Sequence, residues 1–176
     1  MLTPIKTLIL ATVLILTIIG CSSSTQEQSA DASNIVSETS KKPTAEDRNL
    51  AQVVDQYLLL KDALVASNSE ETQAKATKML EVIDATNMMG VQQSAKQIAT
   101  TEDLDTQRTY FDSLSVSVYE LLESQSEGDK TLYKQYCPMA FDNRGAYWLS
   151  NVEEIRNPYF GDQMLKCGRV EETIEY

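Results

Sequence analysis

Four sulfur-bearing side chains near the C-terminus are the residues of this chain whose types and spacing could do chemistry. Cys137 and Met139 occur in a Cys-Pro-Met motif, and Met164 and Cys167 occur in a Met-Leu-Lys-Cys motif. Thiolates and thioethers are soft ligands, which select Cu(I) over hard cations. The four side chains are therefore candidate ligands for Cu(I), or for Ag(I) as its mimic.

The chain contains no histidine, and this excludes several familiar metal centres. Structural zinc sites use four Cys or His ligands, and copper(II) sites use imidazole. Iron–sulfur clusters usually need four cysteines, and covalent haem attachment needs a Cys-x-x-Cys-His motif. Two cysteines with two methionines satisfy none of these requirements, so Cu(I) is the ion that fits the available ligands.

Local backbone preferences predict how each sulfur pair is presented. The proline after Cys137 disfavours helical dihedral angles at that cysteine and favours an extended segment. Residues two apart in an extended segment point the same way, so Cys137 and Met139 are predicted to face one site. Residues three apart lie on one face of a helical turn, which predicts the same for Met164 and Cys167. Gly168 allows a sharp backbone turn directly afterwards.

The same two cysteines have an alternative role. Disulfides form in oxidising compartments, and a bond between Cys137 and Cys167 would stabilise the fold by roughly 3–4 kcal/mol in the chain-entropy model. Met139 and Met164 would then fill the core. Oxidation would remove the thiolates from a metal site and reduction would restore them, so the two states can alternate, and a redox-sensing pair is a third option. The sequence leaves these alternatives open.

Residues 1–20 predict a secretory signal peptide. Lys6 supplies a positive charge, and the apolar stretch that follows is short for a membrane span. The sequence Ile-Ile-Gly-Cys ending at Cys21 resembles a lipobox, which implies cleavage after Gly20 and attachment of lipid to Cys21. An uncleaved anchor, or secretion with a free Cys21, is the alternative. Because Ser22 and no acidic cluster follows, we expect a lipid-anchored protein of the outer membrane that faces the periplasm.

The remaining chain divides into a tether and one domain. Residues 21–43 are rich in serine and free of aromatic residues, which is typical of a flexible linker, and residues 44–176 are long enough for one domain with a core. The formal net charge of the chain is −11, and residues 44–129 contain 16 acidic and 6 basic residues. This balance argues against nucleic-acid binding, which depends on basic patches.

Hydrophobic periodicity predicts a mainly α fold, with a three- or four-helix antiparallel bundle in the first part of the domain. The expected boundary residues are Thr44 as the cap of the first helix, Ser67 as the cap of the second, Gly90 as the end of the second, Thr100 or Thr101 as the cap of the last, and Gly128 as its end. A short helical piece is expected at residues 91–98, with Met88 and Met89 on the second helix or at its end.

Residues 130–176 have a different composition and contain 8 of the 12 aromatic residues of the chain. We expect an irregular module with at most short strands: residues 133–136 prolonging a helix, a strand at 146–149, and turns at 143–145 and 157–159. The chain lacks a histidine base and a phosphate-binding loop, so it is not predicted to be an enzyme.

Four motifs in this module occur in a distinctive order: residues 136–140 (Tyr-Cys-Pro-Met-Ala), 145–150 (Gly-Ala-Tyr-Trp-Leu-Ser), 155–161 (Ile-Arg-Asn-Pro-Tyr-Phe-Gly) and 164–168 (Met-Leu-Lys-Cys-Gly). The set resembles a family of uncharacterised periplasmic domains that occur as small lipoproteins and at the C-terminus of adaptor subunits of heavy-metal (copper/silver) efflux pumps. The similarity covers about residues 48–175.

This resemblance implies a mainly helical fold. It also implies that Cys137, Met139, Met164 and Cys167 match positions expected to hold metal. The predicted function is a lipoprotein that binds Cu(I) or Ag(I) and either sequesters the ion or passes it to a heavy-metal efflux system. The expected partners are a membrane, through the lipid anchor, and a heavy-metal efflux adaptor subunit. The alternative is a disulfide-stapled module without metal, which docks on an envelope or efflux protein.

Overall fold

The structure is a computed structural model that describes residues 45–84, 86–124 and 128–176. The predicted signal peptide (1–20), the predicted tether (21–43) with Cys21, and the predicted cap Thr44 lie outside the described residues. Over the ranges that are described, no helix has the length and apolar character needed to cross a bilayer.

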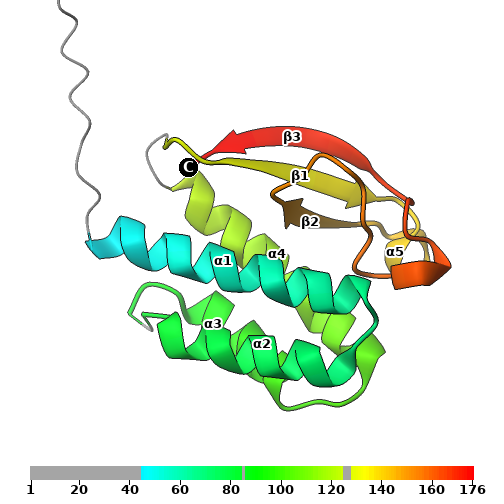
Figure 1. The fold of residues 1–176 in the computed structure, drawn as a ribbon, viewed down its shortest axis with the longest axis horizontal. Helices are drawn as coiled ribbons and strands as arrows, with labels where there is room; N and C mark the ends of the chain where they lie inside the picture. Colours follow the sequence, from blue (N-terminus) through cyan, green and yellow to red (C-terminus); the bar gives the residue numbers. More distant parts are fainter. Residues whose placement is uncertain (1–44, 85, 125–127) are drawn as a thin grey trace, which may run out of the picture. The chain divides into compact units, whose positions relative to one another are not determined.

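Four helices form the first part of the domain: α1 (Ala45–Val65), α2 (Ser69–Val82), α3 (Met89–Ala99) and α4 (Leu104–Glu123). Each packs against the next one along the chain, in the antiparallel arrangement that short connections favour (Figure 1). The predicted mainly α fold is therefore confirmed, and the helical piece expected at residues 91–98 is α3.

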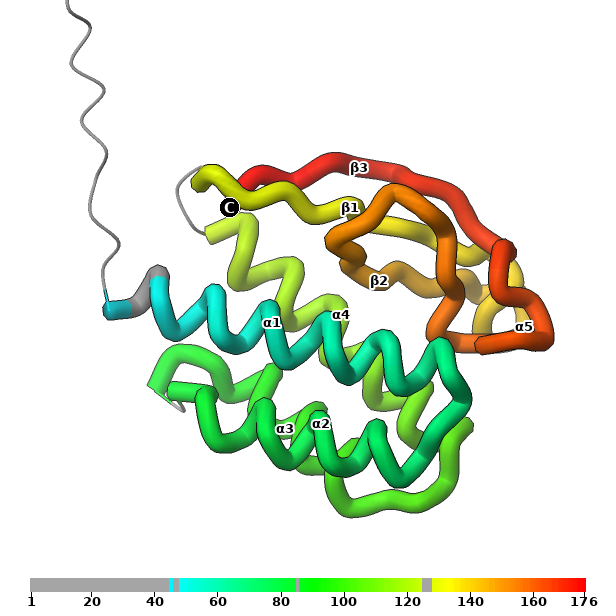
Figure 2. Tube along the Cα trace, viewed as in Figure 1, coloured from blue at the N-terminus to red at the C-terminus, as the bar shows by residue number. Residues whose placement is uncertain are grey.

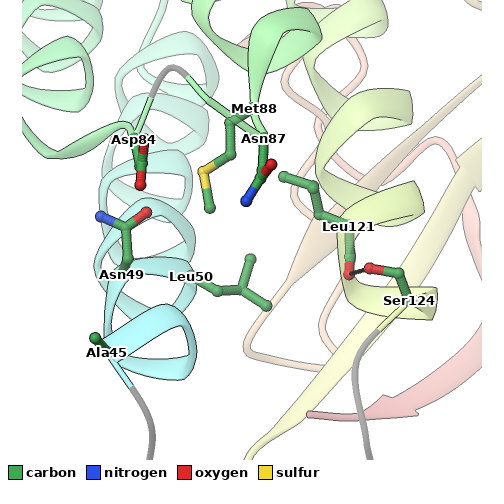
Figure 3. Close-up of a pocket in the computed structure, with 8 residues that line it drawn as sticks. All are labelled: Ala45, Asn49, Leu50, Asp84, Asn87, Met88, Leu121 and Ser124. Atoms are coloured by element: carbon green, nitrogen blue, oxygen red, sulfur yellow. Dashed lines mark hydrogen bonds between the residues drawn. The ribbon is translucent and has the colours of Figure 1, made fainter. Parts of the chain in front are cut away.

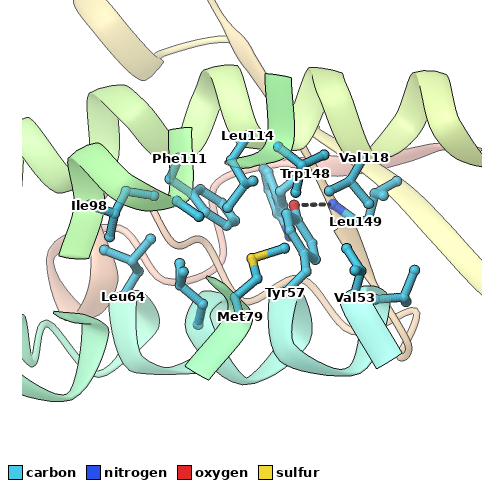
Figure 4. Packing of buried hydrophobic residues seen from close by; sticks show 14 of the residues in the cluster. Val53, Tyr57, Leu64, Met79, Ile98, Phe111, Leu114, Val118, Trp148 and Leu149 are labelled. Atoms are coloured by element: carbon cyan, nitrogen blue, oxygen red, sulfur yellow. Dashed lines mark hydrogen bonds between the residues drawn. The ribbon is translucent and has the colours of Figure 1, made fainter. Parts of the chain in front are cut away.

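The core of the domain lies between these helices and the C-terminal sheet. Tyr57 of α1 stacks on Phe111 of α4 with ring centroids 5.2 Å apart, and both side chains are fully buried. Figure 4 shows Met79 of α2 and Trp148 from the sheet in this core together with Tyr57, and both are fully buried. Because helices and sheet share one core, the C-terminal module is part of the domain rather than an appendage.

The helix caps differ from the predicted ones by one to three residues. The cap of α2 is Asn68 and not Ser67, and its side chain accepts the backbone N–H three residues later at 3.0 Å. The cap of α4 is Asp103 and not Thr100 or Thr101, and its side chain likewise accepts the backbone N–H three residues later, at 2.7 Å. Asparagine, aspartate and serine are about equally good caps, so neighbouring candidates compete and composition alone does not separate them.

Two glycines predicted to end helices do not do so. Gly90 is the second residue of α3, and α2 has already ended at Val82. Met88 and Met89 therefore begin α3 instead of lying on the second helix. The last bundle helix ends at Glu123, with its cap at Ser124, before Gly128 is reached. Glycine is tolerated in the first turn of a helix, where few backbone bonds depend on it.

The C-terminal module contains a three-stranded antiparallel sheet in the order β2-β1-β3: β1 (Thr131–Cys137), β2 (Ala146–Ser150) and β3 (Arg169–Glu175). The strand predicted at residues 146–149 is confirmed as β2. The prediction that residues 133–136 prolong a helix is wrong, since they lie in β1. A window of one helical turn carries little periodic information, and the central strand is specified by partners on both of its sides.

The register gives the sheet two different faces. Alternation along β1 places Lys134 on the face toward α4, where its Nζ lies 3.6 Å from the ring centroid of Tyr119. Gln135 and Cys137 lie on the opposite face, and Trp148 pairs with Gln135 there. The segment between β2 and β3 covers this second face, because Gln135 Nε2 donates to the carbonyl of Val152 at 2.9 Å. Figure 2 traces this segment in orange from the end of β2 to the start of β3.

Two tyrosine hydroxyls close the free edge of β2. Leu149 N–H donates to the hydroxyl of Tyr57 at 3.0 Å, and the hydroxyl of Tyr159 donates to the carbonyl of Tyr147. Tyr57 also shares a hydrogen bond of 2.7 Å with Ser115 Oγ. These bonds tie the sheet to α1 and α4, so the helical bundle supports the strands that carry the candidate ligands.

Candidate metal centre

The sheet register brings the two cysteines of the module together. Tyr136 pairs with Arg169, so one step further along the antiparallel strands Cys137 lies beside Gly168 and next to Cys167. The Sγ atoms of Cys137 and Cys167 are 3.2 Å apart, although thirty residues separate them in the chain. The structure therefore forms a dithiol pair on the covered face of the sheet.

Gly168 is the residue that permits this approach. Its φ of 149° lies in a region that side-chain-bearing residues rarely adopt. A Cβ at this position would lie 2.8 Å from Cη2 of Trp148 and 2.9 Å from the carbonyl oxygen of Tyr136. Glycine thus lets the backbone after Cys167 come into contact with β1 and with the indole ring.

Asn157 holds the segment that carries Cys167. Its side chain is fully buried, and its Nδ2 donates to the carbonyl of Cys167 at 2.7 Å. Its Oδ1 accepts the N–H of Tyr159 at 2.8 Å, and its own N–H donates to the carbonyl of Leu165 at 2.9 Å. The sequence predicts Asn157 only as part of a turn. The Asn-Pro signal for an Asx-type turn was present, but the long-range bond to Cys167 has no local signal.

The two thiols differ in exposure. Cys137 is fully buried, whereas Cys167 is partly exposed. Burial raises the pKa of the Cys167 thiol, and its hydrogen bond with Cys137 and the charge of that neighbour raise it further. At neutral pH Cys167 is therefore a protonated thiol, and a soft metal ion would displace a proton from it on binding.

The two methionines are placed differently from each other. β1 ends at Cys137, and Met139 follows in a turn with φ −92° and ψ −11°, so the alternation that predicted a shared face does not extend to it. The Met139 side chain is 47% exposed. Met164 is half-buried, and its carbonyl accepts the N–H of Cys167 at 3.0 Å. This bond closes a turn, but Met164 has φ −144° and ψ 54°, so it is not the helical turn that was predicted.

Apolar groups surround the buried thiol. Ala146 is the cross-strand partner of Cys137 and is almost completely buried, and the fully buried Trp148 contacts the backbone beside Cys167. The indole Nε1 of Trp148 has no hydrogen-bond partner among the described residues. A site of this kind has a low local dielectric and limits the access of water to sulfur, which favours a soft cation held by thiolates.

A site made of hard ligands is not formed in the described part of the chain. No group of three or more His, Cys, Asp or Glu residues converges there. A pocket of about 460 Å³ lies elsewhere in the domain, between the start of α1, the α2–α3 connection and the end of α4 (Figure 3). Neither cysteine of the dithiol pair is among its lining residues, so the candidate chemistry remains at the two thiols.

Comparison with known protein families gives a match over part of the chain. Residues 53–130 match the family described as "Protein of unknown function (DUF3347)". The matched region begins within α1 and ends at the residue before β1. The chain is therefore similar to that family over the helices, and the match does not include the dithiol pair. No curated protein matches the chain, and no solved structure matches it.

Proposed function

We propose that this chain is an exported, lipid-anchored protein that binds Cu(I) or Ag(I) and either sequesters the ion or passes it to a heavy-metal efflux system. Cys137 and Cys167 would be the main ligands, assisted by Met139 and Met164. The proposal rests on one observation, the separation of 3.2 Å between the two Sγ atoms in a domain without histidine.

The geometry of the pair fits a bound ion after a small adjustment. Metal–thiolate bonds are about 2.3 Å long, so two sulfurs that share one ion lie about 3.7 to 4.6 Å apart, depending on the angle at the metal. Cys137 and Cys167 are slightly closer than this. A rotation of about 30° about one Cα–Cβ bond opens the pair enough and costs about 0.5–1.5 kcal/mol.

The exposure of the four sulfurs gives an order in which an ion would be exchanged. Cys137 is fully buried and would hold the ion most firmly, Cys167 is partly exposed, and the side chain of Met139 is 47% exposed. A partner that offers its own soft ligands would meet Met139 and Cys167 first. Stepwise replacement of these ligands would transfer the ion without releasing it into water.

A competition titration tests the proposal. The reduced full chain is titrated with Cu(I) in the presence of a chromogenic Cu(I) chelator, together with the double variant Cys137→Ser, Cys167→Ser. The wild type is expected to withdraw one ion from the chelator, and the double variant none. Equal withdrawal by both proteins would rule out the site.

Methionine variants test the assisting ligands with a matched control. Met139→Leu is expected to weaken Cu(I) binding by a few-fold and to slow transfer to a thiol-containing acceptor. Met89→Leu is the control, because Met89 is also exposed but lies in the helical bundle. Identical affinities and transfer rates in the two variants would remove Met139 from the proposal.

Attachment to the membrane is tested separately. Cys21→Ser is expected to move the protein from the membrane fraction to the soluble periplasmic fraction and to abolish incorporation of labelled palmitate. Unchanged fractionation and labelling would contradict the lipid anchor without affecting the metal site.

A second candidate function is a disulfide-stapled docking module. The 3.2 Å separation also allows a disulfide, whose bond length is about 2.05 Å, after a small approach of the sulfurs. Tyr147 is 41% exposed and packs on Tyr136, with their ring centroids 4.5 Å apart. The guanidinium carbon of Arg169 lies 5.0 Å from the centroid of the Tyr136 ring. Tyrosine and arginine are enriched at protein interfaces. Counting of free thiols on protein taken from the envelope and quenched with acid separates the two functions. A stable Cys137–Cys167 disulfide would favour the docking function, and two free thiols would favour the metal-binding function.

A further inference from the structure

The dithiol pair is asymmetric in a way that assigns its two cysteines different parts in thiol–disulfide exchange. We propose that Cys167 is a site of S-thiolation by low-molecular-weight disulfides, and that Cys137 is the resolving thiol that converts the adduct into an intramolecular disulfide. The consequence for metal drawn below rests on the proposed function, whereas the assignment of the two thiols does not.

Access determines which sulfur reacts first. Exchange requires a thiolate to attack a disulfide sulfur in line with the sulfur–sulfur bond, so the attacking atom must be reachable from solvent. Cys137 is fully buried on the covered face of the sheet, whereas Cys167 is partly exposed in the connection before β3. An external disulfide therefore meets Cys167.

Proximity determines the second step. Cys137 Sγ is already 3.2 Å from Cys167 Sγ, and the hydrogen bond from Asn157 to the carbonyl of Cys167 holds the segment in place. Once Cys167 carries an adduct, the nearest thiol to its sulfur is Cys137. A reaction between groups held in contact is favoured over attack by a second external molecule.

The external disulfide, RSSR, is the only oxidant that the two steps require. In the first step the Cys167 thiolate, formed by loss of its proton, bonds to one sulfur of RSSR, and the RS–SR bond breaks to release RS⁻, which takes up that proton. In the second step the Cys137 thiolate bonds to Cys167 Sγ and displaces the second RS⁻, which takes up the Cys137 proton. The protein dithiol is oxidised by two electrons, and RSSR is reduced to two RSH.

The redox state and metal binding exclude one another at this site. A Cys137–Cys167 disulfide has no thiolate to offer a soft ion, and an ion held by both sulfurs leaves no thiolate free to attack RSSR. Accumulation of disulfide would therefore block loading of the empty protein, and the bound ion would protect the loaded protein.

Mapping of adducts on the full chain tests the assignment. Reduced wild type, Cys137→Ser and Cys167→Ser are mixed with excess oxidised glutathione at pH 8, acid-quenched over a time series and mapped by peptide mass spectrometry, which separates the peptide of Cys21. Cys137→Ser is expected to accumulate a glutathione adduct on Cys167. Cys167→Ser is expected to form an adduct on Cys137 at least about tenfold more slowly, because that thiol is buried. Wild type is expected to end as the intramolecular disulfide.

Early time points on the wild type protect the test against variants that fold poorly. The first adduct on the wild type is expected on Cys167. A first adduct on Cys137, or a glutathione adduct on Cys167 that persists in the wild type without an intramolecular disulfide, would overturn the assignment.

A parallel arm contains one equivalent of Ag(I), which is expected to slow oxidation of the wild type at least about tenfold by occupying both sulfurs. If oxidation proceeds as assigned but Ag(I) gives no protection, the metal function fails and the assignment of the two thiols stands.

Discussion

Substitution of Gly168 tests the geometry of the dithiol pair most sharply, because it changes no ligand. In Gly168→Ala the new Cβ would meet Cη2 of Trp148 at 2.8 Å and the carbonyl oxygen of Tyr136 at 2.9 Å. Trp148 is fully buried and the other atom belongs to the central strand, so neither moves cheaply. The unfavourable φ of 149° adds backbone strain of about 1–3 kcal/mol, and the steric conflict adds about 1–3 kcal/mol.

The least costly relief is a retreat of the segment that carries Cys167, since this segment is more exposed than the strand that it contacts. Such a retreat separates the two thiols. We expect Gly168→Ala to lower the free energy of unfolding by about 2–4 kcal/mol. If metal binding must restore 2 kcal/mol of strain that the retreat relieves in the metal-free protein, Cu(I) affinity falls by about thirtyfold, because each 1.4 kcal/mol corresponds to a factor of ten.

Gly90→Ala is the matched control. Gly90 lies in α3, and a Cβ there meets only the side chain of Ser117, with Oγ at 2.7 Å. Alanine gains at most about 1 kcal/mol of helix propensity, less at this position in the first turn, and this gain opposes the cost of adjusting one serine rotamer. Urea unfolding and the chelator competition are measured on both variants. The account of Gly168 would be refuted if both variants unfolded within about 0.5 kcal/mol of wild type and bound Cu(I) equally well.

Three further outcomes follow from particular contacts. Tyr57→Phe is expected to lower the free energy of unfolding by about 1–3 kcal/mol in urea, because Leu149 N–H loses its buried acceptor; a loss below about 0.5 kcal/mol would contradict the edge-closing role. Asn68→Ala is expected to lower the free energy of unfolding by about 0.5–2 kcal/mol through loss of the α2 cap, and to leave Cu(I) affinity unchanged. A drop in affinity would contradict the independence of this cap from the two thiols. The raised pKa of Cys167 contributes stability below the ordinary thiol pKa of about 8.5, and this contribution is lost as pH rises through the folded-state pKa. Reduced wild type should therefore lose stability more steeply above pH 8.5 than Cys167→Ser, and parallel pH profiles would contradict the shift.

The helical part of the fold was predictable because it is specified locally. The apolar stripe that includes Val53, Tyr57 and Leu64 lies in the core as its spacing requires. Helix boundaries were less predictable, because Asn68 and Ser67 are both capable caps and only the packed structure selects one. The strand β1 was missed because its partners lie at distant positions in the chain, so its conformation is decided by pairing rather than by local preference.

The candidate site was only partly predictable, because some of its features are local and others depend on long-range pairing. The turn that joins Met164 to Cys167 is local and is closed by a backbone hydrogen bond, but Met164 has φ −144° and ψ 54°, so the helical turn on which the shared face was predicted is not formed there. The position of Met139 was predicted from an extended segment that in fact ends at Cys137. The approach of the two thiols depends on the register of β1 with β3 and on the buried side chain of Asn157, which are long-range features that spacing does not encode.

The most direct test of the proposed metal site is X-ray absorption at the copper edge on the full chain loaded with one equivalent of Cu(I) under reducing conditions. We predict a first shell that contains only sulfur, with metal–sulfur distances near 2.3 Å, and loss of this shell in the Cys137→Ser, Cys167→Ser variant. A first shell of nitrogen or oxygen, or the same sulfur shell in the double variant, would contradict the assignment of the metal to these two thiols.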